Sequence, residues 1–319
     1  MYNLFGLIMF STEFYPLCIT SRDMLTPDVM RLRLQRPDGT MLPAFRAGAH
    51  VQIQINEQYR RAYSLCSDPA QRGHYEVAVK LELDGRGGSQ ILHQMAQPGV
   101  ELAVSTPSNL FALASDAAHH LLVGGGVGLT PLIAMAYELS ARQQPFTFVV
   151  AASSRGAWPF AAQLNTSGWP VDVVQSPREQ LDLPTRLAAL PASTHVYCCG
   201  PEGLMARVRD QCALLPAVQW HEEAFSGSEV RVESGFQLYL SESDLMLEVS
   251  AGSSIIAALR QAGVQVDTAC EQGICGSCVV PWRDGEPVHG DQCLDEEDRC
   301  EYMAVCCGGC RSPRLTLAL

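Results

Sequence analysis

Hydrophobic and polar residues alternate along several short segments between residues 30 and 105. The alternating segments are 30–35, 51–55 and 75–83, and turns rich in glycine and proline lie at 37–39, 73, 84–88 and 98–99. A period of two is typical of a β-strand with one buried face. Repeated short strands joined by turns predict a small antiparallel β-barrel.

The pattern changes near residue 115. An apolar run at 120–123 leads into a glycine-rich turn and then a helical stretch at 130–141. Thr130 can cap that helix, and Pro131 suits its first turn. Further apolar runs follow at 146–152 and 195–199. Strands that alternate with helices predict an α/β unit with a parallel sheet.

The C-terminal part begins after a polar stretch. This stretch, 226–235, has the composition of a linker. Beyond it the pattern predicts two short strands, one helix and a cysteine-rich loop, which is an α+β arrangement. The predicted elements are strands at 236–240 and 245–249 and a helix at 253–262. The predicted divisions of the chain are 1–113, 114–226, a linker at 227–235, and 236–319.

Length and charge narrow the classes of function. A chain of 319 residues is long enough for two or three domains. The net charge of −12 argues against a nucleic-acid partner. Residues 236–319 hold 13 acidic and 5 basic residues, a net charge of −8. This acidic part is either a solvated face or a docking surface for a basic partner.

The sequence contains no segment typical of a membrane protein. The early apolar run at 4–10 is far shorter than the roughly 20 residues that a spanning helix needs. No basic region precedes it, and no small-residue cleavage site follows it. Several of the 13 cysteines have the spacing of metal ligands, which favours a reducing compartment. We therefore expect a cytoplasmic protein with no membrane partner.

Three cysteines form the most specific motif in the chain. Cys270, Cys275 and Cys278 follow the spacing Cys-x₄-Cys-x₂-Cys, which is typical of a plant-type [2Fe-2S] cluster. Two irons and two sulfides need four thiolates and a loop that folds closely around them. Gly273 and Gly276 allow such a loop. A structural zinc site usually shows two close cysteine pairs instead, so the spacing favours the cluster.

The fourth ligand is less clearly specified. Cys306, Cys307 and Cys310 all lie in one short stretch. Cys306 follows Cys278 by 28 residues and is the preferred candidate. Two further thiols are interpreted as spare, namely Cys293 and Cys300.

Two groups of residues in the predicted barrel have the chemistry of an FMN site. Such a site needs a cation and N–H donors for the phosphate, and a flat ring against the isoalloxazine. Tyr63 can stack on the flavin, and Arg61 can meet the phosphate. The two groups are Arg61, Tyr63 and Ser64, followed one strand later by Arg86, Gly87, Gly88 and Ser89.

The glycine-rich turn after 120–123 predicts a nucleotide site. A strand, a glycine turn and a helix bring a pyrophosphate to the helix N-terminus. The turn is not a full Gly-x-Gly-x-x-Gly motif, because Leu129 stands where the third glycine would be. Cys199, Gly200 and Pro201 end a second strand, and a small side chain there leaves room for nicotinamide. The alternative for Cys199 is an ordinary buried strand cysteine.

In this order, the motifs resemble those of the phthalate dioxygenase reductase family, which includes vanillate demethylase and carnitine monooxygenase reductases. The resemblance covers the chain from about residue 15 to its end. It implies a multi-domain protein with a six-stranded antiparallel flavin-binding β-barrel, an α/β nicotinamide-binding domain and a C-terminal [2Fe-2S] ferredoxin domain of the β-grasp type. It also implies an enzyme that passes electrons from NADH through FMN and the cluster to a Rieske-type oxygenase.

Site residues can be carried over from the resemblance by motif. FMN would be held by Arg61, Tyr63, Ser64, Gly87, Gly88 and Ser89, with Lys80 along the ring. The NADH site would be lined by Gly125, Gly126, Gly128, Thr130, Cys199, Gly200 and Pro201. Cys199 and Phe225 would position the reacting rings, with Phe225 a stronger candidate than Glu223. The cluster ligands would be Cys270, Cys275, Cys278 and Cys306.

The chain also departs from the family pattern. Cys307-Gly-Gly-Cys310 replaces a Ser-Arg-Ala-like stretch, which could alter exposure of the cluster. Ser153-Ser154-Arg155 replaces Arg-Ser-Arg, and the missing cation favours NADH over NADPH. Two rival functions are a passive ferredoxin-like carrier and a reductase for a di-iron monooxygenase. The intact flavin motif and the domain order, respectively, argue against them, and the resemblance implies a monomer.

Overall fold

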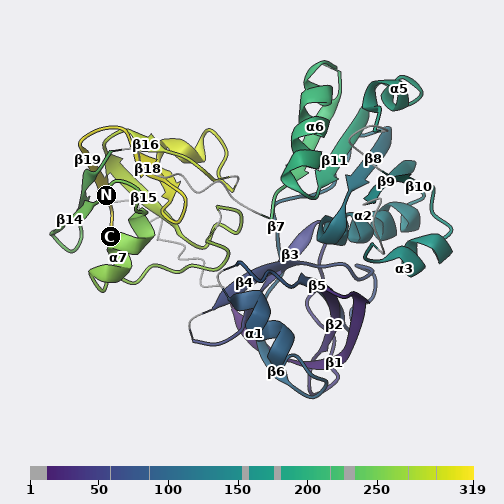
Figure 1. Cartoon of the computed structure of the whole chain (residues 1–319), viewed down its shortest axis with the longest axis horizontal. Coiled ribbons are helices and arrows are strands. Elements are labelled where there is room, and N and C mark those ends of the chain that lie inside the picture. Colours follow the sequence, from purple (N-terminus) through teal and green to yellow (C-terminus); the bar gives the residue numbers. More distant parts are fainter. Residues whose placement is uncertain are drawn as a thin grey trace, which may run out of the picture.

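The computed structural model describes residues 13–57, 59–85, 87–152, 158–175, 181–215, 217–225, 234–271, 273–291 and 293–319. Three units are visible in it, and Figure 1 shows a barrel below, a parallel sheet with helices to the right and a C-terminal unit to the left. The early apolar run at 4–10, Arg86 and Ser153-Ser154-Arg155 lie outside the described residues, as does most of the predicted linker.

The first unit is an antiparallel β-barrel. Its main strands follow the order β4-β3-β6-β1-β2-β5, and a bridge between Leu65 and Val77 joins the two ends of that order. The short strand β7 pairs with β3 outside the ring, so the structure adds one strand to the six that the resemblance implies. The elements are β1 (Phe14–Thr26), β2 (Val29–Gln35), β3 (Ala49–Gln54), β4 (Arg60–Ser64), β5 (Tyr75–Lys80), α1 (Gly88–Met95), β6 (Glu101–Ser105) and β7 (Ser108–Asn109).

Alternation along β2 shows why these segments form strands. Leu32 and Leu34 are fully buried, whereas Arg31 and Arg33 point outward and pair with Glu76 of β5. The predicted alternating segments are confirmed as strands. The segment predicted at 75–83 was too long, because β5 ends at Lys80 and the chain turns through an exposed Leu83.

The second unit is a five-stranded parallel sheet in the order β10-β9-β8-β11-β12. Thr130 does not cap its first long helix as predicted. That helix begins at Leu129 after a 3-10 turn, and the Thr130 hydroxyl donates to the carbonyl of Val127 at 2.9 Å. The elements are β8 (His119–Gly124), η1 (Gly126–Gly128), α2 (Leu129–Ala141), β9 (Phe146–Ala152), α3 (Ala161–Thr166), β10 (Val171–Gln175), α5 (Leu183–Ala188), β11 (Thr194–Cys199), α6 (Glu202–Ala213) and β12 (Gln219–Glu223).

The C-terminal unit combines a mixed five-stranded sheet, in the order β14-β13-β19-β15-β17, with one helix. Both strands and the helix predicted here are confirmed, and the Ser254 hydroxyl caps the helix by accepting from the Ala257 N–H. The elements are β13 (Phe236–Leu240), β14 (Leu245–Val249), α7 (Ile255–Gln261), β15 (Val279–Asp284), β16 (Pro287–Val288), η2 (Asp298–Cys300), β17 (Tyr302–Ala304), β18 (Gly309–Cys310) and β19 (Arg314–Leu317).

The cores show how the units associate. Buried residues of the barrel and of the parallel-sheet unit belong to one continuous apolar cluster, in which the rings of Phe111 and Tyr197 lie 5.8 Å apart. The C-terminal unit has a separate core around Leu238, Leu259 and Leu315. Among the described residues, no helix is both long and apolar enough to cross a membrane. The cytoplasmic location and the numbered division of the chain stay predictions.

Candidate flavin, nucleotide and cluster sites

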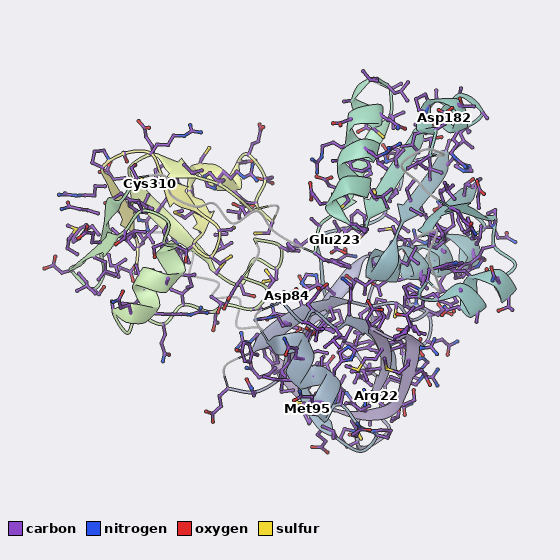
Figure 2. All side chains as sticks on the ribbon, in the orientation of Figure 1. Arg22, Asp84, Met95, Asp182, Glu223 and Cys310 are labelled. Atoms are coloured by element: carbon purple, nitrogen blue, oxygen red, sulfur yellow. The ribbon has the colours of Figure 1, made fainter. Side chains whose placement is uncertain are left out.

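Strands β3 and β4 of the barrel contact both other units. The Ser64 hydroxyl at the end of β4 donates to a carboxylate oxygen of Glu223, at the end of β12, at 3.1 Å. Figure 2 labels Glu223 where the parallel-sheet unit meets the other two. The Arg61 guanidinium donates to the carbonyl of Ala269, 3.2 Å away and next to Cys270 in sequence. The predicted flavin strand therefore lies between the predicted nucleotide sheet and the predicted cluster loop.

Arg61 is packed against the start of helix α1. A Cβ on Gly88 would lie 3.2 Å from the Arg61 Nε, and Gly87 has a positive φ of 91°. Only glycine takes such a backbone conformation without strain, so this pair lets the helix start approach the guanidinium closely. The helix N-terminus and a cation thus face one location, which suits a phosphate. The structure brings Arg61, Gly87 and Gly88 together as predicted.

Several buried polar atoms near Ser64 lack partners within the described part of the chain. His50 pairs with Ser64 across β3 and β4 and is 3% exposed, and neither of its ring nitrogens is hydrogen-bonded to a residue that the structure describes. The Oε1 atom of Gln52 is likewise buried and without a partner among the described residues. Buried polar groups are normally hydrogen-bonded. A flavin, with its polar ring edge, is a group that fits these orphaned atoms.

The other predicted flavin residues, Tyr63, Lys80 and Ser89, differ in burial and in their hydrogen-bond partners. Tyr63 is half-buried against the core, and burial raises the pKa of its phenol, so the ring stays neutral and able to stack. Lys80 is exposed, and its ammonium group pairs with the Glu82 carboxylate at 2.6 Å. The Ser89 hydroxyl accepts from the N–H of Glu82 at 3.1 Å. Lys80 and Ser89 stay predictions as flavin contacts.

The glycine-rich turn is packed tightly on the end of β11. The Gly125 N–H donates to the carbonyl of Cys199 at 3.2 Å. A Cβ on Gly128 would lie 2.5 Å from the same carbonyl carbon and oxygen, so no larger residue fits. Gly126 has a positive φ of 59° and open space around it. The structure therefore brings together the predicted turn and Cys199-Gly200-Pro201 at adjacent strand ends, the usual position of a nucleotide in parallel sheets.

The thiol of Cys199 is fully buried, at 0% exposed. Burial, with the nearby Glu223 carboxyl, raises its pKa well above the usual range, so it remains a neutral thiol. This surrounding matches the alternative of a buried strand cysteine, and a contact with nicotinamide stays a prediction. Phe225 is half-buried at the edge of the shared core, two residues after Glu223.

Glu223 is the residue that the sequence interpretation undervalued. Its side chain is 5% exposed, and burial raises its pKa to about 7, while the bond from Ser64 acts in the opposite direction. The sequence interpretation ranks Phe225 above Glu223. The alternation of β12 distinguishes Glu223 from the adjacent Glu222, whose carboxylate pairs with Arg209 on the outer side.

The four predicted cluster thiols lie as two pairs. The N–H groups of Cys270 and Cys275 each lie 3.4 Å from the sulfur of the other residue, and the thiols of Cys278 and Cys306 are hydrogen-bonded to one another. Among the described side chains, no three of the His, Cys, Asp and Glu type converge as a mononuclear metal site. Two thiolates for each of two irons is the donor set that a [2Fe-2S] cluster needs, so the residues fit it.

Hydrogen bonds already favour thiolates at two of these positions. Hydrogen bonds between Cys275 and its neighbours Cys270 and Ser277 lower the pKa of the Cys275 thiol to about 6. Cys278, Cys307 and the Gly273 N–H lower the pKa of Cys306 to about 4. Gly273, with φ of 71°, has no room for a Cβ, which would lie 2.5 Å from the Cys307 sulfur.

The other candidate fourth ligands differ in position. Cys307 is buried beside Cys306 and contacts it. Cys310, which ends β18, instead contacts Ser312 and Arg314 through its thiol. Cys300 is exposed on η2, and Cys293 is half-buried. Proximity to Cys278 thus supports Cys306, with Cys307 as its neighbour.

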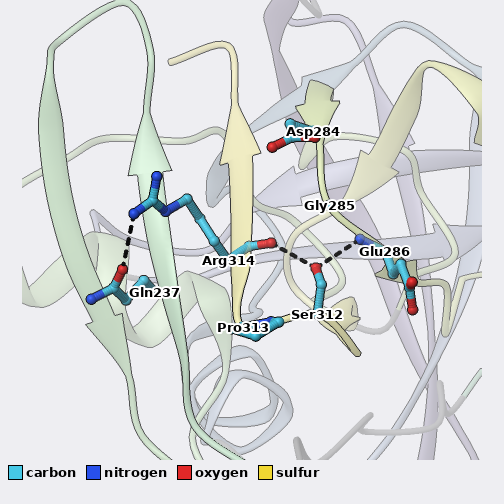
Figure 3. Close-up of a pocket in the computed structure, with 7 residues that line it drawn as sticks. All are labelled: Gln237, Asp284, Gly285, Glu286, Ser312, Pro313 and Arg314. Carbon is cyan, nitrogen blue, oxygen red and sulfur yellow. Dashed lines mark hydrogen bonds between the residues drawn. The ribbon is translucent and has the colours of Figure 1, made fainter.

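Two hollows on the surface lie away from these residues. Figure 3 shows one on the C-terminal unit, where the Ser312 hydroxyl donates to the Arg314 carbonyl and accepts from the Glu286 N–H. It is lined by Gln237, Asp284, Gly285, Glu286, Ser312, Pro313 and Arg314. A second hollow borders Phe45 and Glu138. Neither is lined by a predicted cofactor residue.

Comparison with known proteins agrees with this arrangement. Residues 16–112 match the family described as the oxidoreductase FAD-binding domain, and residues 238–311 match the 2Fe-2S iron-sulfur cluster binding domain. The chain is 36% identical over 298 residues to the heme-dependent oxidative N-demethylase beta subunit of Ectopseudomonas mendocina, covering 91% of this chain and 94% of that one.

Two further comparisons cover almost the whole chain. Phthalate dioxygenase reductase of Burkholderia cepacia is 34% identical over 314 residues, covering 96% of this chain and 98% of the relative. The solved structure of a phthalate dioxygenase reductase aligns with a TM-score of 0.75 and 33% identity, over 96% of this chain and 98% of that one. The chain therefore belongs to the phthalate dioxygenase reductase family, and it is an oxidoreductase with a flavin-binding domain, a nicotinamide-binding domain and a [2Fe-2S] domain.

Proposed function

We propose that this chain takes hydride from NADH, divides the electron pair at FMN, and passes single electrons through a [2Fe-2S] cluster to a Rieske-type oxygenase. The bound flavin and cluster supply the redox chemistry, because a flavin accepts two electrons and releases them singly whereas a cluster carries one. The observation that carries the proposal is the position of β4. It contacts the end of the nucleotide sheet through Ser64 and the cluster loop through Arg61.

The roles of the chain's own residues follow from their surroundings. Arg61 and the start of α1, with Gly87, Gly88 and Ser89, would hold the phosphate of FMN. Tyr63 would stack on the ring, Ser64 would hydrogen-bond its polar edge, and Lys80 would lie along it after leaving Glu82.

At the proposed NADH site, different residues would likewise bind the pyrophosphate and border the nicotinamide. The turn through Gly125, Gly126 and Gly128, with Thr130, would receive the pyrophosphate of NADH, and Gly200 and Pro201 would border the nicotinamide. Cys199 and Phe225 would position the rings rather than move protons, because hydride transfer needs no acid or base. Cys270, Cys275, Cys278 and Cys306 would hold the two irons.

The partner is proposed from the relatives. One relative named above is a phthalate dioxygenase reductase and the other is the beta subunit of an oxidative N-demethylase, which supports an oxygenase partner. The relative described as heme-dependent also favours a second candidate, an oxygenase whose centre is a haem. The net charge of −8 on residues 236–319 would attract a basic surface on either partner. We propose that the reductase itself is a monomer.

An anaerobic titration tests the function. Stoichiometric NADH is expected to bleach the flavin absorbance and then produce the rhombic low-temperature EPR signal of a reduced cluster. A chain that takes no electrons from NADH, or that reduces its flavin without ever reducing the cluster, would contradict the proposal. Chromatography of the released flavin separates FMN from FAD, and the same titration with NADPH tests the preference for NADH.

A further inference from the structure

A chain of hydrogen bonds connects the barrel to the predicted cluster. The Nε2 atom of Gln52, on β3, donates to the hydroxyl oxygen of Ser277 at 2.7 Å. The protonated Cys275 thiol donates to the same hydroxyl oxygen, with 3.4 Å between sulfur and oxygen. Gln52 and Ser277 are 225 residues apart in sequence and belong to different units. Gln52 is 5% exposed, so the contact is shielded from water on the barrel side.

The direction of these hydrogen bonds decides whether the Ser277 hydroxyl can donate its proton to the Cys275 sulfur. A hydroxyl has one proton to donate and two lone pairs that accept. When the Gln52 amide occupies the hydroxyl oxygen as a donor, the Ser277 proton is left for another acceptor. The sulfur of Cys275 is that acceptor once the cysteine is a thiolate ligand. A hydrogen bond to a ligand sulfur stabilises the more negative, reduced state of a cluster.

We propose that Gln52 is a positioning residue for electron transfer, which holds the Ser277 hydroxyl so that its proton points to the Cys275 sulfur. The barrel thereby sets part of the cluster's reduction potential across the boundary between units. The same contact holds the cluster loop on the flavin strand, together with the bond from Arg61 to the Ala269 carbonyl. With both cofactors bound, transfer from flavin to cluster would move one electron, and the Gln52–Ser277 pair would keep its protons.

The inference rests on the proposed function, since it assumes that the cluster receives its electrons from the flavin. It makes an additional claim about three named residues. A serine that only packs against the loop would contribute no hydrogen bond from its hydroxyl. A glutamine that only holds the units together would change the rate of transfer but leave the cluster potential unchanged.

The test is a set of redox titrations of the loaded protein, followed by EPR of the cluster. Gln52→Leu and Ser277→Ala are each expected to lower the cluster potential, so that the one-electron equilibrium constant between flavin and cluster falls several-fold. A tenfold fall corresponds to about 59 mV. The double variant is expected to match Ser277→Ala alone, because Gln52 acts only through that hydroxyl.

Two further variants complete the set. Gln52→Glu supplies an acceptor that draws the Ser277 proton away from the sulfur, and it is expected to lower the potential at least as far as Gln52→Leu. Gln54→Leu is the matched control on the same face of β3, because the Gln54 amide donates to barrel carbonyls at Asn56 and Tyr59. The control is expected to leave the potential unchanged.

The outcomes separate this inference from the proposed function. Unchanged potentials in Gln52→Leu and Gln52→Glu would overturn the inference, as would independent, additive shifts in the double variant. In each of those cases NADH would still reduce flavin and cluster, so the proposed function would survive. If Gln52→Leu loses the cluster during purification, Gln52→Glu and Ser277→Ala decide together, because the first redirects the Ser277 proton and the second removes it.

Discussion

Ser64 and Glu223 form a buried hydrogen bond between the barrel and the parallel-sheet unit, with the hydroxyl 3.1 Å from the carboxylate oxygen. The two residues end strands β4 and β12, which belong to different sheets. Burial of the carboxyl raises its pKa to about 7 from an ordinary value of 4.5. The contact therefore places a group that titrates near neutral pH at the centre of the proposed flavin and nucleotide sites.

The first prediction concerns stability and pH. Between about pH 4.5 and pH 7 the folded chain keeps a proton on Glu223 that the unfolded chain has released, so stability falls as pH rises through this window. Glu223→Gln removes this loss. As pH rises from 5 to 8, the free energy of unfolding of the variant is expected to increase relative to that of the native chain by on the order of 1 to 3 kcal/mol.

Thermal melting of the flavin-loaded protein, followed by flavin fluorescence at both pH values, measures this difference. Glu222→Gln is the control, because the Glu222 carboxylate pairs with Arg209 on the outer side of the strand. Parallel responses of native chain and Glu223→Gln to pH would show that the buried carboxyl does not titrate in this window.

The second prediction tests the proposed phosphate site between Arg61 and the start of α1. Arg61→Ala removes the cation beside the start of α1, and charge-assisted hydrogen bonds contribute about 1.5 to 3 kcal/mol. The dissociation constant for FMN is expected to rise roughly 10- to 100-fold, measured by fluorescence quenching on titration of the flavin-free chain. Arg60→Ala should bind flavin normally, because Arg60 faces Asp267 and Gln54 instead. Equal loss in both variants would argue against a phosphate role specific to Arg61.

The third prediction concerns the glycine turn. Gly128→Ala would place a methyl group 2.5 Å from the Cys199 carbonyl, so the turn or β11 must shift. Overpacking of this kind costs about 1 to 3 kcal/mol, and we expect a lower melting temperature and slower reduction of the flavin by NADH. Gly203→Ala, in helix α6 with open space around it, is the control and should be neutral or slightly stabilising. Stopped-flow reduction of both variants provides the comparison.

Sequence patterns predicted local structure here better than contacts between units. The periods of 30–35 and 236–240 identify which faces are buried, and the cysteine spacing identifies a cluster loop, because these signals are local. The contacts of Gln52 with Ser277 and of Ser64 with Glu223 join residues more than 150 positions apart. Alternation assigns such a side chain to a face of its strand, but it carries no information about which unit covers that face.

Competition from neighbours close in sequence explains the failed Thr130 cap and the observed pairing of Lys80, whose contact with the flavin stays a prediction. Thr130 has the residue type of a helix cap, yet the preceding 3-10 turn moves the helix start to Leu129, and the Thr130 hydroxyl bonds backward to Val127. Lys80 lies at the predicted place on β5, but Glu82 two residues later attracts its ammonium group. In both cases a neighbour close in sequence competes for a side chain whose role had been assigned by motif.

The last prediction separates two adjacent cysteines. Cys306 is hydrogen-bonded to both Cys278 and Cys307, whereas Cys307 packs against Gly273 and donates weakly to the Ala304 carbonyl. Cys306→Ser is therefore expected to lose most of the cluster, because a serine oxygen binds the iron of such a cluster less well than a thiolate. Cys307→Ser is expected to keep its iron and sulfide content and its visible absorbance, since it removes a neighbour rather than a ligand.

Iron, sulfide and EPR measurements on both variants make the comparison, with Cys310→Ser as the control. The Cys310 thiol contacts Ser312 and Arg314 rather than one of the paired thiols, so its loss should leave the spectrum unaltered. A cluster that survives Cys306→Ser but not Cys307→Ser would assign the fourth ligand to Cys307. A cluster that survives either single change but not both would mean that the two thiols can substitute for one another, which their contact in the structure permits.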